Sequence, residues 1–510
     1  MTNRNLSIAT VCCVAIASAS LLVAAEPVYD AWAWLVWGRE LAGLALDTSS
    51  GPSFKPLPVA ITSLLSLAGD AAPQLWLLLV RASWLLALVL AGALAHRLSA
   101  GLGRRPQAFA AAFAGLSLAL LRDDVTMWAR QGAAGMSEPL LVALVLGAVA
   151  AGLEQRSRTA LVLGALAALI RPEVWPLLAA YGLWRWRAQP ALRPWLAALA
   201  VAVPALWIVP GVLSAGDAAS AGERARRGAG APAGEMLEAL WRGVQMPLLA
   251  AWPLALYAIA GSRRRRRAAT GAAAAAPSPG SPARTRTVSG GPAPNDPRIP
   301  AGTLLVLFAG AVAWIAVVVI MAGAGFAGLP RFMAPAAALI GVIAGVGLAR
   351  RLASGQRPRR DMAAVALLLL VVAQVAHRAG ELPHSISTTA RIARSHDDLR
   401  RLAGEIGRDR LLRCGRLATS DVLVRTALAW ELGVPLGDVV TFGDLPAQDG
   451  AFVVGSQASP LLAAFMRGHA DLAGERGEWR VYSLGCPPAG AADSSSSASV
   501  RITGVSGADL

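Results

Sequence analysis

Long apolar segments separated by clusters of arginine are the feature that most constrains this chain. Such segments recur from the amino-terminal end to residue 377, and a bilayer crossing needs roughly 20 apolar residues. Across the chain 55% of residues are hydrophobic and only 15% are charged, whereas soluble domains have a charged share of about 25%. The sequence therefore predicts an α-helical polytopic membrane protein and excludes an ordinary soluble globule.

We expect about eleven transmembrane helices, counted by the length that a crossing needs. They lie near residues 5–25, 75–95, 106–121, 138–153, 159–170, 172–184, 194–213, 243–261, 302–322, 331–349 and 362–377. The first segment resembles a signal peptide, but it is longer than a usual h-region and Ser18-Ala19-Ser20 is a weak cleavage site. We therefore expect a retained first helix.

The loops between these segments are of two kinds, and the two kinds alternate along the chain. One kind is rich in arginine and nearly free of acids: Arg97/Arg104/Arg105, Arg156/Arg158, Arg185/Arg187/Arg193, Arg263 to Arg267 and Arg350/Arg351/Arg357/Arg359/Arg360. The other kind carries most of the acids. Arginine-rich loops favour the cytoplasmic side. We thus expect a multi-pass protein of the cytoplasmic (inner) membrane, contacting membrane lipids, with its amino terminus inside. The net charge of +16 then reflects topology, and no nucleic-acid partner is expected.

Residues 161–184 allow two interpretations. They form either one long helix kinked at Pro172 or two short helices that meet at Arg171-Pro172-Glu173. A single crossing would place later arginine clusters outside, against the charge rule. Two short helices are therefore favoured. Their freed backbone groups would need a protein or water-filled cavity.

The remaining regions are not expected to cross the membrane. Within a membrane domain at 1–384, residues 26–74 form a long first outer loop, and residues 262–300 form a disordered cytoplasmic linker of Arg, Pro and Gly. Residues 385–487 read as a small α/β domain on the outer face, with helices near 387–406 and 421–432 and β-like runs near 411–418, 451–455 and 479–484. A flexible tail at 488–510 follows.

The cysteines fit this arrangement. Cys12 and Cys13 lie inside the first helix as small apolar residues. Cys414 and Cys486 are the two cysteines of the outer domain, and in an oxidising compartment they are candidates for a disulfide. No Cys-x-x-Cys motif or histidine cluster indicates a metal site, so we expect no cofactor and no built-in metal, and a metal requirement stays open.

Chemistry is most expected in the first outer loop. Asp30 follows the first helix and opens a stretch with Trp32, Trp34 and Trp37, which suit a segment in the headgroup layer. A carboxylate at that depth would be a good proton acceptor. The alternative is that Asp30 only caps a helix. On residue types alone the two interpretations are even.

Four motifs in order resemble the GT-C superfamily of membrane glycosyltransferases, which includes protein O-mannosyltransferases and the aminoarabinose transferase of lipid A. They are the outer-loop Asp30 followed by Lys55-Pro-Leu-Pro58, then Met136-Ser-Glu138-Pro139, then Arg171-Pro172-Glu173, and finally Pro330-Arg331-Phe332. The match spans roughly residues 5–350. Each motif alone is weak, and their joint order carries the resemblance.

The resemblance implies that Asp30 is the catalytic base of an inverting sugar transfer from a polyprenyl-phosphate donor. Its leaving phosphate needs positive charge, and the candidates are Lys55, Arg130, Arg171 and Arg331, of which Lys55 and Arg331 are favoured. Each could instead be an anchor whose charged end reaches water at the membrane interface, which is the commoner role for such residues. Glu138 and Glu173 would orient the acceptor or pair with these arginines. Many members carry two adjacent acids where this chain has Asp30-Ala31, and Glu26 could stand in for the second.

The function that the resemblance implies is a membrane glycosyltransferase acting at the outer face, with a glycan, lipid or protein as acceptor. Two other classes stay open. A secondary transporter would also use broken helices and buried charge, but usually shows internal repeats, and none is visible. A non-catalytic envelope-assembly protein with a GT-C-like body would not depend on Asp30.

Overall fold

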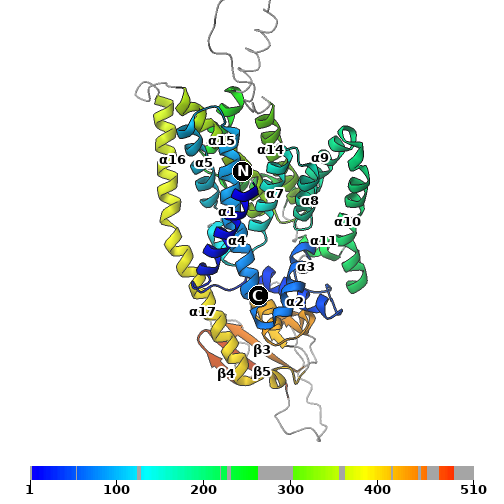
Figure 1. Cartoon of the computed structure of the whole chain (residues 1–510). Helices are drawn as coiled ribbons and strands as arrows, with labels where there is room; N and C mark the ends of the chain where they lie inside the picture. Colours follow the sequence, from blue (N-terminus) through cyan, green and yellow to red (C-terminus); the bar gives the residue numbers. More distant parts are fainter. Residues whose placement is uncertain are drawn as a thin grey trace, which may run out of the picture.

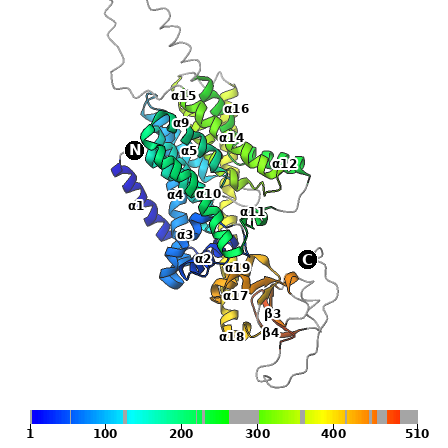
Figure 2. The ribbon, with the colours of Figure 1, turned by 90° about the vertical axis from the view of Figure 1, so that its right-hand side faces the viewer.

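The computed structural model describes residues 3–52, 54–122, 128–218, 220–226, 231–261, 302–354, 362–414, 417–445, 450–456 and 470–486. Within these ranges the chain forms a bundle of helices with a small sheet-containing domain at one end (Figure 1). The helix α17 (Leu382–Ile406) continues from α16 (Met362–Gly380) into that domain. The view turned by 90° shows the same stacking of the bundle on the domain (Figure 2).

The helices of the bundle overlap the predicted apolar segments, except that the segment predicted at 243–261 contains the end of one helix at Gln245 and a short helix that begins at Ala251. They are α1 (Asn3–Ser20), α4 (Ala72–Leu98), α5 (Arg104–Ala119), α7 (Glu138–Leu153), α8 (Ser157–Ala168), α9 (Val174–Ala188), α10 (Arg193–Ala215), the helix Ala251–Gly261, α14 (Thr303–Gly323), α15 (Ala334–Ala353) and α16. Shorter elements are α2 (Tyr29–Ala42), α3 (Pro56–Leu65), η1 (Ser66–Ala71), α6 (Trp128–Ala133), η2 (Pro190–Leu192), α11 (Ser220–Ala225), α12 (Pro232–Gln245) and η3 (Pro330–Met333).

Four helical stretches of the described ranges are long and apolar enough to cross a membrane. They are Pro56–Leu98, Pro190–Ala215, Thr303–Gly323 and Pro330–Ala353, and shorter apolar helices accompany them. The chain is therefore a mostly helical membrane protein. That it crosses the membrane about eleven times stays a prediction. The predicted linker at 262–300 and tail at 488–510 lie outside the described residues.

The break at Arg171-Pro172-Glu173 separates two helices, which confirms the favoured interpretation of that segment. α8 ends at Ala168 and α9 begins at Val174. Proline cannot donate a helical hydrogen bond, so the chain turns there. The turn places Arg171 and Glu173 side by side, both buried.

The arginine-rich loops contact one another. Arg97, after α4, donates to Glu154, after α7, at 2.8 Å. Arg185, near the end of α9, donates to the hydroxyl of Ser157 at the start of α8. Loops that were predicted to share one side of the membrane therefore lie together.

The tryptophans of α2 overturn one expectation. Trp32, Trp34 and Trp37 are at most 1% exposed and belong to a core shared by α2, α4 and the C-terminal domain. Trp32 packs against Trp430 of α19 (Val422–Glu431), with ring centroids 6.1 Å apart. The assignment of these rings to the lipid headgroup layer is wrong, because the C-terminal domain covers the face that the sequence leaves open.

The C-terminal domain is a five-stranded sheet with helices packed against it. Its strands are β1 (Leu417–Thr419), β2 (Val439–Thr441), β3 (Ala451–Ser456), β4 (Asp471–Arg476) and β5 (Trp479–Leu484), in the order β2-β1-β3-β5-β4. β1 pairs in parallel with β2 and β3, whereas β5 pairs antiparallel with β3 and β4. A disulfide joins Cys414 before β1 to Cys486 after β5, with Cα atoms 6.0 Å apart. A short helix α18 (Arg408–Leu411) and the turns η5 (Leu436–Asp438) and η6 (Phe442–Asp444) complete the domain.

Candidate functional site

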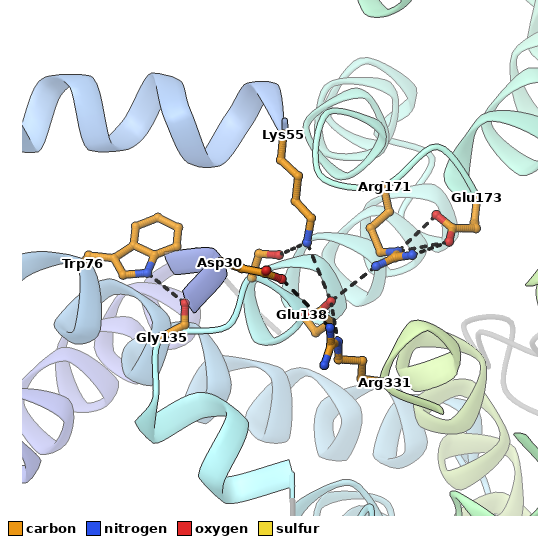
Figure 3. A network of polar contacts seen from close by, with 9 residues as sticks. Asp30, Lys55, Trp76, Gly135, Glu138, Arg171, Glu173 and Arg331 are labelled. Carbon is orange, nitrogen blue, oxygen red and sulfur yellow. Dashed lines mark hydrogen bonds and ion pairs between the residues drawn. The ribbon is translucent and has the colours of Figure 1, made fainter. Parts of the chain in front are cut away.

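Glu138 is the centre of a buried network of charged side chains (Figure 3). It is the first residue of α7, directly before Pro139, and its side chain is fully buried. Its Oε1 atom lies 3.8 Å from Nζ of Lys55, 3.4 Å from Nη1 of Arg171 and 3.9 Å from Nε of Arg331. A buried carboxylate needs such partners, because an unpaired charge in a low-dielectric interior is very costly.

Lys55 reaches this network from the start of α3. It occupies the N-cap position, and Pro56 at the first helical turn fixes the backbone behind it. Its ammonium donates to the hydroxyl of Ser137 at 3.0 Å and lies 4.7 Å from the ring centroid of Trp34. These contacts hold a flexible side chain in one direction.

Arg171 and Glu173 form the second ion pair of the network. Nε of Arg171 donates to both carboxylate oxygens of Glu173 at 3.1 Å, and Nη2 lies 2.5 Å from Oε1. The guanidinium carbon of Arg171 also lies 3.3 Å from the ring centroid of Phe332. The turn between α8 and α9 thus supplies both members of the pair, and Phe332 of η3 packs against Arg171.

Arg331 links this network to Asp30. Its Nη2 atom lies 4.0 Å from Oδ2 of Asp30, while its Nε atom faces Glu138. Both distances exceed the 2.7–3.2 Å of an N–H···O hydrogen bond, and Nε of Arg331 has no hydrogen-bond partner in the described residues. Arg331 is therefore held by electrostatic attraction to the two carboxylates, and its guanidinium keeps N–H donors that make no hydrogen bond to them.

Asp30 does not cap its helix. The N-cap of α2 is Val28, and no side chain caps that end. The Asp30 carboxylate instead points toward Arg331 (Figure 3) and is 24% exposed. The capping interpretation is therefore wrong, and the carboxylate is free to meet a molecule from outside.

A cavity of about 1210 Å³ opens beside Asp30 and Arg331, between the bundle and the C-terminal domain. Its lining includes residues of α2, α6, α12, η3, α17 and the sheet domain. Lys55, Glu138 and Arg171 are not part of this lining. Asp30 and Arg331 therefore form the boundary between the buried network and the cavity.

Two other candidate residues are placed apart from the network. Arg130, on α6, lines the cavity. Glu26 is directed to the C-terminal domain, where its carboxylate lies 3.7 Å from Nη2 of Arg400 on α17. Burial raises the pKa of Glu26 to about 7, although the positive charge of Arg400 acts in the opposite direction.

Three cavity arginines were missed by the sequence reasoning. Arg242 comes from α12, and Arg391 and Arg394 come from α17. The only sequence signal for Arg391 and Arg394 was their spacing on one predicted helix, and this spacing does not indicate which element the helix faces. Among the described residues, no group of three or more His, Cys, Asp or Glu side chains could hold a metal ion.

No protein-family model and no curated protein matches the chain. A solved structure does match: ArnT from Cupriavidus metallidurans, bound to undecaprenyl phosphate, superposes with a TM-score of 0.52. The match covers 94% of this chain and 98% of that one at 15% sequence identity. The chain thus shares the overall fold of that ArnT structure over nearly its whole length.

Proposed function

We propose that the protein is a membrane glycosyltransferase that moves a sugar from a polyprenyl-phosphate donor to an acceptor at the outer face of the cytoplasmic membrane. The observation that carries the proposal is Arg331, placed between Asp30 and Glu138 at the wall of a large cavity. The shared fold supports it, because the solved structure of ArnT contains undecaprenyl phosphate.

Asp30 is assigned the role of general base. An acceptor hydroxyl in the cavity would give its proton to the Asp30 carboxylate while its oxygen forms a bond to the anomeric carbon of the donor sugar. The bond between that carbon and the phosphate oxygen breaks, and polyprenyl phosphate leaves with the electron pair. Attack opposite to the leaving group inverts the anomeric centre.

Arg331 and Lys55 are assigned to the leaving phosphate. Negative charge grows on that phosphate as the bond breaks, and fixed cations stabilise it in a site shielded from water. Arg331 is partly exposed and lines the cavity, so it is assigned the first contact with the phosphate. Lys55 lies behind it, 10% exposed, on the other side of the Glu138 carboxylate.

Glu138, Arg171 and Glu173 are assigned a positioning role. Glu138 attracts both Lys55 and Arg331 to one carboxylate oxygen, and Glu173 pairs with Arg171. Three cations and three carboxylates, counting Asp30, thus balance within the network. Such a balance keeps a densely charged interior folded before the donor binds.

The test is mass spectrometry of envelope lipids and glycans after deletion of the gene. The proposal predicts that a polyprenyl-phosphate sugar accumulates and that one glycan, lipid or protein loses that sugar. Re-expression of the wild-type chain should reverse both changes. Unchanged lipid-linked sugars and unchanged glycans in the deletion strain would contradict the proposal.

A further inference from the structure

The carboxylates that line the cavity already have protein partners. The contacts are those of Asp30 with Arg331, of Asp398 with Arg476, of Asp421 with the backbone amide of Leu423, and of Glu478 with the hydroxyl of Ser395. Each carboxylate keeps further lone pairs that can accept from a hydroxyl group. The acids of the wall therefore suit a ligand rich in hydroxyl groups.

Three arginines that line the same cavity, Arg130, Arg391 and Arg394, have fewer side-chain partners. In the part of the chain that the structure describes, the guanidinium groups of Arg130 and Arg391 make no hydrogen bond and no ion pair. Arg394 reaches only the carbonyl of Ala390 in its own helix, at 3.4 Å. In the described residues, none of these three arginine side chains is therefore paired with a carboxylate.

These arginines also repel one another. Arg130 lies on α6, which packs against α17, the helix that carries Arg391 and Arg394. Burial and then the positive charge of Arg391 lower the pKa of the Arg130 guanidinium. Like charges held together without a counter-charge destabilise a fold, and a bound anion would remove that cost.

We propose that Arg130, Arg391 and Arg394 bind an anionic group of the acceptor, so that the acceptor is an acidic carbohydrate whose hydroxyl faces Asp30. The inference deepens the proposed function, because it names the acceptor class of the same cavity. Guanidinium groups bind phosphate and carboxylate in the same forked geometry. The cavity volume of about 1210 Å³ exceeds the roughly 300–1,000 Å³ of a site for one small molecule.

The anion subsite is separate from the one assigned to the donor phosphate. Arg331 faces the buried network around Glu138, whereas Arg130 and the two α17 arginines do not contact that network. The Asp30 carboxylate lines the same cavity as both groups. An acceptor held by its acidic group on α6 and α17 therefore has Asp30 within the same enclosed space.

The experiment measures sugar binding to the purified full-length protein while saturating undecaprenyl phosphate occupies the donor subsite. The probes are glucose 6-phosphate, glucuronate and neutral glucose. We expect at least one acidic sugar to bind and glucose to bind much more weakly. The double variant R130Q/R391Q should lower the affinity for the acidic sugar roughly tenfold or more. The control R401Q removes an exposed α17 arginine that pairs with Asp397 and should bind like wild type.

A purely structural role makes a different prediction. If Arg130 and Arg391 stabilise the fold, R130Q/R391Q lowers the melting temperature. If the two arginines repel each other and serve to bind an anion, the variant leaves the melting temperature unchanged or raises it. Should R130Q/R391Q fail to fold, the single variants R391Q and R394Q replace it. Equal binding of glucose, absent binding of both acidic sugars, or full binding by the variants would overturn the inference. If undecaprenyl phosphate does not bind but acidic sugars still bind through these arginines, the donor assignment fails and the anion subsite stands.

Discussion

The Asp30 carboxylate and the Arg331 guanidinium face each other 4.0 Å apart at the edge of the cavity. The two residues are 301 positions apart in the sequence, on α2 and η3. At that distance the charges attract without a hydrogen bond. A proton acceptor and a cation are thus held together, each still able to contact a substrate.

Arg331 is expected to hold the donor phosphate. The variant R331Q removes the charge and the unused donor, and hydrogen bonds between charged groups contribute about 1.5–3 kcal/mol each. We therefore predict that undecaprenyl phosphate binds roughly 10- to 100-fold more weakly to R331Q, measured by titration of the purified protein. R401Q is the matched control, and equal affinity of R331Q and R401Q would contradict the assignment.

Glu138 is expected to be essential for stability. E138Q leaves Lys55, Arg171 and Arg331 without their shared counter-charge, and removing one member of a buried ion pair costs about 3–5 kcal/mol. E154Q is the control, because the partly exposed Arg97–Glu154 pair should contribute less than about 1 kcal/mol. Melting temperatures in detergent compare the two. A smaller loss in E138Q than in E154Q would refute the role of Glu138.

Gly38 is expected to set the position of α2, the helix that carries Asp30. A Cβ atom on Gly38 would lie 2.6 Å from the backbone carbonyl carbon of Thr62 on α3, so G38A must push the two helices apart. We predict a destabilisation of about 1–3 kcal/mol and reduced sugar transfer. G310A, on α14, meets no atom within 4 Å and should be neutral in both measurements. Wild-type behaviour of G38A would argue against close packing of α2 on α3.

Glu26 predicts a pH dependence of stability. Its pKa rises from 4.5 to about 7 on folding, so the folded state holds the proton more tightly than the unfolded state does. Stability contributed by this group is complete below pH 4.5 and is lost as the pH rises to about 7. A shift of that size corresponds to an upper limit of ~3 kcal/mol.

The variant E26Q tests this dependence. Glutamine cannot ionise, and Arg400 keeps its contact with Glu431 at 2.9 Å. We predict that E26Q melts at a higher temperature than wild type at pH 8, with little difference at pH 4.5. A difference that is the same at both pH values would show that ionisation of Glu26 does not weaken the contact between α17 and the bundle.

The sequence could predict the elements of the bundle and several members of the charged network. The length of each apolar segment predicts where a helix lies, and Pro172 explains why α8 and α9 are separate. The motifs containing Asp30, Glu138, Arg171 and Arg331 named residues that the structure brings together. Their distances did not follow from the sequence, because they depend on how α2, α7 and η3 pack.

The parts that could not be predicted depend on contacts with the C-terminal domain. The burial of Trp32 requires α19, and the approach of Arg391 to the cavity requires α17 to pack against α6. The strand order could not be predicted either, since β1 and β2 have three residues each. Such short runs carry too little alternation to indicate their neighbours.

Replacement of Asp30 tests the central claim most directly. Cells that lack the protein would receive the wild-type chain, D30N or the control D70N, which changes an exposed carboxylate outside the cavity, at matched expression levels. The measured quantity is the polyprenyl-phosphate sugar in the envelope lipids, by mass spectrometry. We predict that D30N accumulates the lipid-linked sugar as the deletion does, while wild type and D70N do not. Full restoration by D30N would contradict catalysis by Asp30 and favour a non-catalytic role in envelope assembly.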